Sequence, residues 1–75
     1  MSRLPRVTGR QMVAALGKLG FATVKVTGSH VHLKRTATPG LVTVPVHAGE
    51  TLAPGLVRSI LRQAGVSDEE FVTLL

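Results

Sequence analysis

The stretch Gly28-Ser29-His30-Val31-His32-Leu33-Lys34-Arg35 decides the fold class that we expect of this chain. Apolar and polar residues alternate through it, as in a β-strand with one face buried and the other in water. This alternation turns Val31 and Leu33 towards a core. The side chains that share the other face are those of His30, His32 and Lys34. We therefore predict a strand from about residue 29 to residue 35 with two imidazoles and an ammonium group on one side.

The two imidazoles on this face favour proton transfer. Histidine has an ordinary pKa of about 6.5, so it can accept and donate a proton near neutral pH. Next to a cation that neutralises phosphate, such a pair is suited to cleaving RNA without a metal ion. A solvated strand face that carries two histidines and a lysine without any function is, however, the more common situation.

A strand before this one completes a predicted hairpin. Residues 21–26 are rich in β-branched side chains with a period of two, which places Val24 and Val26 inside and Lys25 outside. Thr27-Gly28 is suited to the tight turn between the two antiparallel strands.

A third strand is expected after the hairpin. Residues 36–40 contain Pro39-Gly40 and are predicted to form a loop. The strand then covers residues 41–44 and ends at Pro45, because proline cannot donate a hydrogen bond to the sheet.

Three helices flank these strands in the sequence. Thr8 and Gln11 have the spacing of a capping box, which predicts a helix over residues 9–19. A second helix begins near Pro54 and ends at Gly65, and a short third one follows Ser67-Asp68-Glu69-Glu70. The predicted fold class is α+β, in the order α-β-β-β-α with a short C-terminal helix, with the helices on one face of a three-stranded antiparallel sheet. The other face of such a sheet is open to water.

Length and composition narrow the class of protein. With 75 residues, the chain is expected to form a single domain over residues 1–75, too small for a large enclosed cofactor cavity. It has no cysteine, which excludes disulfides and thiolate metal sites. No apolar run is long enough for a signal peptide or a membrane span, so we expect a soluble, cytoplasmic protein.

Charge is distributed unevenly along the chain. Seven basic residues and no acidic one occur up to Arg35, and Arg3 is the first of them. Two arginines and four acidic residues follow, which gives a net charge of +5. A basic first half favours a surface for polyanions. With only Phe21 and Phe71 as aromatic residues, contacts to phosphate and to the shape of the nucleic acid are expected rather than base stacking.

Several motifs together resemble the HicA-type (YcfA-like) toxins of toxin-antitoxin modules. These motifs are Lys18-Leu19-Gly20-Phe21, Gly28-Ser29-His30, Val42-Thr43-Val44-Pro45 followed by His47, and Ser59-Ile60-Leu61-Arg62-Gln63-Ala64-Gly65 leading to Glu69-Glu70-Phe71. The resemblance implies a fold like that of double-stranded-RNA-binding domains and a type II system in which the toxin is an mRNA interferase. It also implies cleavage of RNA without a metal or other cofactor, and a HicB-type antitoxin as partner.

The resemblance assigns the catalytic role to His30. Many family members have a second histidine directly after it, where this chain has Val31 and then His32. We therefore treat His32, His47 and Ser29 as candidates for supporting roles in catalysis. The candidates for RNA binding are Lys25, Lys34, Arg35, Arg58 and Arg62.

Two other classes of function fit the same residues. The chain could bind double-stranded RNA without cleaving it, with Arg58 and Arg62 on phosphates. Alternatively, His30, His32 and His47 could bind zinc in a metal hydrolase, although no cysteine or clear carboxylate partner accompanies them.

Overall fold

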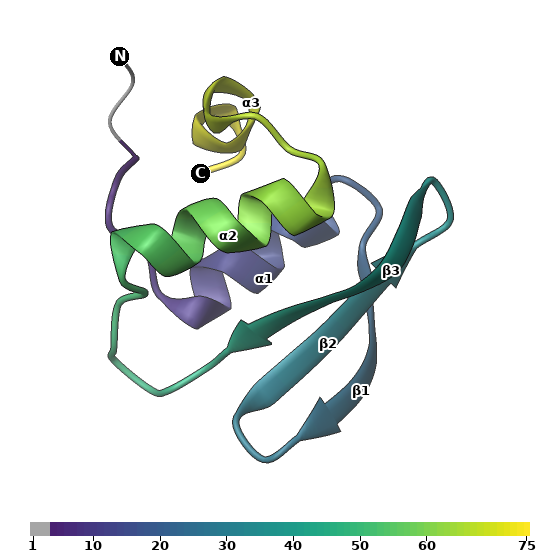
Figure 1. The fold of residues 1–75 in the computed structure, drawn as a ribbon. Helices are drawn as coiled ribbons and strands as arrows, with labels where there is room; N and C mark the ends of the chain where they lie inside the picture. Colours follow the sequence, from purple (N-terminus) through teal and green to yellow (C-terminus); the bar gives the residue numbers. More distant parts are fainter. Residues whose placement is uncertain (1–3) are drawn as a thin grey trace.

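The computed structural model describes residues 4–75, so Arg3 lies outside the described residues. The elements are α1 (Gly9–Gly17), β1 (Ala22–Thr27), β2 (His30–Arg35), β3 (Thr38–Pro45), α2 (Pro54–Ala64) and α3 (Asp68–Thr73) (Figure 1). This is the predicted α+β order, with a three-stranded antiparallel sheet and the helices on one side of it. Within residues 4–75, no helix is long and apolar enough to cross a membrane.

The predicted helix caps are present. The hydroxyl of Thr8 accepts a hydrogen bond from the backbone N–H of Gln11, and the Gln11 side chain accepts one from the backbone N–H of Thr8. At α3, the hydroxyl of Ser67 accepts a hydrogen bond from the backbone N–H of Glu70, which is one half of a capping box. These bonds satisfy backbone donors that have no partner inside the helix.

The histidine strand β2 lies in the centre of the sheet, in the order β1-β2-β3. On one side of β2, His32 is paired with Lys25 of β1, and on the other side it is paired with Thr43 of β3. Val31 is paired with Val44 in the same ladder. Paired residues share a face of a sheet. Lys25 and Thr43 therefore stand on the same face as His32.

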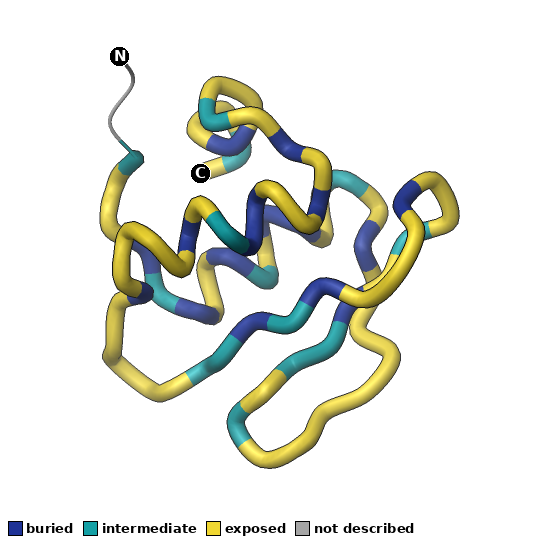
Figure 2. Tube along the Cα trace, viewed as in Figure 1, coloured by how far each residue is buried: buried dark blue, intermediate teal, exposed yellow. Residues whose placement is uncertain are grey.

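The core lies between the sheet and the helices (Figures 1 and 2). Both α1 and α2 pack on β3, and α3 packs on α2. The largest fully buried side chains come from the sheet and from all three helices: Met12, Leu16, Leu33, Val42, Val44, Val57, Ile60, Leu61 and Phe71. The face of β2 that carries Leu33 is thus the core face, as the alternation predicts.

The prediction that Val24 and Val26 point into the core is wrong. Their side chains are 56% and 60% exposed, and every residue of β1 is exposed. β1 lies at the edge of the sheet farthest from β3, the strand that contacts the helices. A bulge between Thr23 and Lys25 also interrupts the alternation on which the prediction depends.

The predicted loop over residues 36–40 is also wrong for its second half. β3 begins at Thr38, because Thr38 pairs with Arg35 across the hairpin and leaves only a two-residue turn. Pro39 is compatible with this strand since β3 is an edge strand, where a missing backbone donor costs little.

Candidate functional site

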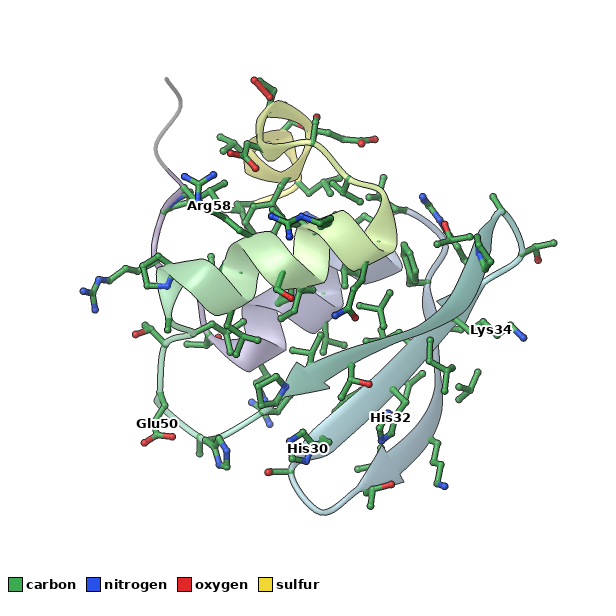
Figure 3. All side chains as sticks on the ribbon, in the orientation of Figure 1. His30, His32, Lys34, Glu50 and Arg58 are labelled. Atoms are coloured by element: carbon green, nitrogen blue, oxygen red, sulfur yellow. The ribbon has the colours of Figure 1, made fainter. Side chains whose placement is uncertain are left out.

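The open face of the sheet carries the predicted site. His30, His32 and Lys34 follow one another along β2, away from the helices (Figure 3). Lys25 joins them from β1. The acidic residues of the chain are Glu50, in the loop after β3, and Asp68, Glu69 and Glu70 of α3, so none belongs to the sheet. The open face is therefore cationic.

His32 is the more firmly held of the two histidines on β2. It is half-buried, and its Nδ1 lies 2.9 Å from Oγ1 of Thr43. This contact fixes the plane of the ring, and Nε2 has no hydrogen-bond partner among residues 4–75. Whether Nε2 then carries a proton depends on which way the hydrogen bond runs, because a neutral imidazole has one donor and one acceptor nitrogen.

His30 stands at the start of β2 and is exposed. Thr27 is opposite it on β1 and Pro45 on β3. Among residues 4–75, no side chain forms a hydrogen bond or ion pair with its ring. An exposed imidazole in this state has both nitrogens available for proton transfer.

A turn-to-loop contact brings His47 to the same end of the sheet. The backbone N–H of Val46 donates to the carbonyl of Ser29 over 2.7 Å. The Nε2 atom of His47 consequently lies 3.5 Å from Oγ of Ser29, which is long for a strong hydrogen bond. The structure thus places Ser29, His30 and His47 at one corner, with His32 next along the strand.

Arg35 is partly buried and is held by several contacts within the protein. Its Nε donates to Oγ1 of Thr38 over 2.6 Å, and its two terminal nitrogens donate to the carbonyls of Leu19 and Ala64, each over 3.2 Å. The guanidinium carbon also lies 4.5 Å from the centre of the Phe21 ring, a cation–π distance. These contacts give Arg35 a structural role, and its RNA-binding role stays a prediction.

Arg58 and Arg62 belong to α2 rather than to the open face. Arg58 forms an ion pair with Asp68 at 3.1 Å and remains half exposed. Figure 3 shows Arg58 on the helical side of the molecule, away from His30 and His32. The structure therefore does not bring these arginines together with the histidines.

The three-histidine zinc site finds no support. Within residues 4–75, no group of three or more histidine, cysteine or acidic side chains is arranged to hold a metal ion. His30, His32 and His47 lie at the same end of the sheet without forming such a group.

Arg10 is the residue near this end that the sequence did not single out. It lines a cleft with His47 between the start of α1 and the loop after β3. Gly9 allows the start of α1 to lie close against the end of β3, because a Cβ at position 9 would overlap the carbonyl oxygen of Pro45. A glycine at the first position of a predicted helix is a weak signal for such close packing, since it does not show which segment packs against the helix.

Comparison with known families agrees with this arrangement. Residues 9–66 of the 75-residue chain match the model of the HicA toxin of bacterial toxin-antitoxin systems. The chain belongs to the HicA toxin family. No curated protein matches the sequence. As a HicA toxin, the chain is the toxin component of a toxin-antitoxin module and has an antitoxin as its partner.

Proposed function

We propose that this HicA toxin is a metal-independent endoribonuclease that cleaves mRNA in the cytoplasm, with His30 in acid–base catalysis. The observation that carries the proposal is the state of His30. It is an exposed imidazole, without a partner among the described side chains, on a cationic sheet face. Family membership supports the toxin role.

The chemistry requires two proton transfers. A base removes the proton of the ribose 2′-OH, whose oxygen attacks the adjacent phosphorus. The bond from phosphorus to the 5′-oxygen then breaks, and an acid protonates that oxygen. His30 supplies one of these transfers, and His32 is the candidate for the other. Side chains two residues apart on a strand are about 6.6 Å apart at their bases, so one phosphate can lie between them.

The cations of the open face contribute to catalysis by electrostatic stabilisation. Lys25 is paired with His32 across the ladder, and Lys34 is two residues further along β2. Positive charge at these positions stabilises the additional negative charge that develops on the phosphate. Ser29 and His47 are proposed to orient His30 or the RNA beside it, and a HicB-type protein is the proposed antitoxin.

Replacing His30 tests the proposal. His30→Ala is expected to reduce RNA cleavage by roughly 10²- to 10⁴-fold, the usual contribution of a proton-transfer group. Its free energy of unfolding is expected to change by no more than about 0.5 kcal/mol, because the side chain is exposed. His32→Ala is the paired variant, with an equal loss if His32 is the second acid or base. A folded His30→Ala protein that cleaves RNA at the wild-type rate would contradict the proposal.

The main alternative is a double-stranded-RNA-binding module without activity. The α-β-β-β-α order, which such modules share, and the basic residues of α2 favour it. Cleavage of RNA by the purified chain distinguishes the two functions, and it should persist in excess chelator. Binding of duplex RNA that depends on Arg58 and Arg62, without any cleavage, would support the alternative.

A further inference from the structure

A cleft of about 400 Å³ lies beside the histidine corner, between the start of α1 and the loop after β3. Among residues 4–75, Arg10 is the one lining residue that carries a full charge, and His47 of the loop after β3 also lines the cleft. The lining residues are Thr8, Arg10, Val46, His47, Ala48 and Gly49. Glu50 follows them in the sequence but does not line the cleft.

The loop that borders the cleft is fastened at both ends. At one end, the N–H of Val46 donates to the carbonyl of Ser29 over 2.7 Å. At the other end, the N–H of Leu52 donates to the carbonyl of Val7 over 2.7 Å, and Thr8 and Thr51 form an antiparallel bridge. The cleft is thus held between two fixed segments, and a ligand need not order them.

The side chain of Arg10 is the group in this cleft that can hold an anion. Thr8, beside it in the lining, carries no charge, and its hydroxyl accepts a hydrogen bond from the backbone N–H of Gln11. Among residues 4–75, no hydrogen bond or ion pair occupies the Arg10 side chain. Its guanidinium can therefore form a two-pronged contact with a phosphate.

We propose that this cleft binds a phosphate of the RNA strand next to the nucleotide that is cleaved at His30, with Arg10 as the phosphate-binding residue. The proposal rests on the ribonuclease function. His47 connects the two places, since it lines the cleft and also lies 3.5 Å from Ser29, the neighbour of His30. An RNA strand that crosses the histidine corner thus continues into the cleft.

Binding to a non-cleaving protein tests this directly. In the His30→Ala background, Arg10→Gln is expected to weaken the affinity for a short single-stranded oligoribonucleotide about tenfold. It should also reduce the slope of log affinity against log salt by about 0.7, the value for one lost phosphate contact. Fluorescence anisotropy at several salt concentrations measures both. Lys18→Gln removes one positive charge at the other end of α1 and should change affinity less than about twofold.

Shortening the RNA locates the contact. For the protein with His30 intact, Arg10→Gln should raise KM for long oligonucleotides. It should have no effect on the shortest ones that are still cleaved, because these do not reach the cleft. Inorganic phosphate should shift the backbone amide signals of Ala48 and Gly49 in wild type but not in Arg10→Gln.

Two results would overturn the proposal. One is an unchanged RNA affinity and salt slope for Arg10→Gln. The other is an Arg10→Gln protein that binds RNA normally but binds the antitoxin more weakly, which would make the cleft part of a protein interface. Failure of the proposed function looks different: the wild-type protein would then not cleave RNA, or His30→Ala would cleave it at the wild-type rate, whatever Arg10→Gln does to binding.

Discussion

Arg35 joins four segments of the molecule through one guanidinium group. It reaches the start of β3 at Thr38, the end of α2 at Ala64 and the segment after α1 at Leu19, and it covers the ring of Phe21. A guanidinium has five donors in a fixed plane, which suits it to collecting carbonyl and hydroxyl oxygens from different elements. Lysine, with a single ammonium group, cannot make the same set of contacts.

We predict that Arg35→Ala lowers the free energy of unfolding by about 1.5–3 kcal/mol, the range for hydrogen bonds to a charged group. For a domain of this size, this corresponds to a decrease in Tm of roughly 6–24 °C. Lys34→Ala is the matched control. Lys34 is next to Arg35 in the sequence but its side chain is exposed, so this substitution should change the free energy of unfolding by no more than about 0.5 kcal/mol. Thermal unfolding followed by circular dichroism measures both. Equal melting temperatures would show that Arg35 does not fasten these segments together.

At the scale of elements, α1 begins directly against the end of β3. An ideal Cβ on Gly9 would overlap the carbonyl oxygen of Pro45 and lie 2.9 Å from Cα of Val46. Gly17, the last residue of the same helix, has no atom within 4 Å of such a Cβ. The two glycines therefore form a natural pair for comparison.

We predict that Gly9→Ala destabilises the fold by about 1–3 kcal/mol, as expected for overpacking against backbone that cannot yield locally. Gly17→Ala should instead stabilise it by about 0.4–1 kcal/mol, because alanine restricts the unfolded chain. Denaturant unfolding of both variants measures the difference. A Gly9→Ala protein as stable as wild type would mean that α1 and β3 separate without cost.

The elements themselves could be predicted from the sequence because their signals are local. Capping residues and a regular apolar period specify the helices and β2. A period of two also predicts a strand over residues 21–26, close to the observed β1, but it does not show that this strand lies beyond the helices that cover the sheet. The exposure of Val24 and Val26 depends on this placement and on a bulge, and neither has a local signature.

The candidate site could also be predicted only in part from the sequence. His30 and His32 could be predicted to share the open face, because neighbours along a strand follow its alternation. The position of His47 depends on a hydrogen bond between Val46 and Ser29, and that of Arg10 on the contact of Gly9 with β3. Contacts between distant segments set both positions, and a single sequence contains no record of such contacts.

At the scale of the whole molecule, charge is separated between two surfaces. Lys25 and Lys34 lie on the sheet, whereas three of the four acidic residues lie in the first turn of α3, which packs on α2. The open face therefore attracts polyanions and acidic proteins, and the α3 end repels them.

We predict that the antitoxin covers the open face and places carboxylates or bulk against His30 and Lys34. In NMR titrations with the antitoxin, signals of these two residues should shift, and RNA binding should be lost at the same time. Increasing salt should weaken the complex, because exposed charge pairs are screened. Shifts confined to residues 68–75 would contradict direct occlusion and favour an effect transmitted from a distance.

The bridge between Thr8 and Thr51 has a consequence for the order in which the molecule is completed. Each pair of adjacent strands needs only a short turn to close, whereas this bridge joins segments more than half the chain apart. Short closures cost less entropy and form sooner. Since a ribosome releases the chain from its N-terminus, residues 22–45 can pair before Thr51 has emerged. A nascent toxin thus displays the histidines of β2 before it has the cleft beside them, because the cleft forms only after Thr51 has been synthesised.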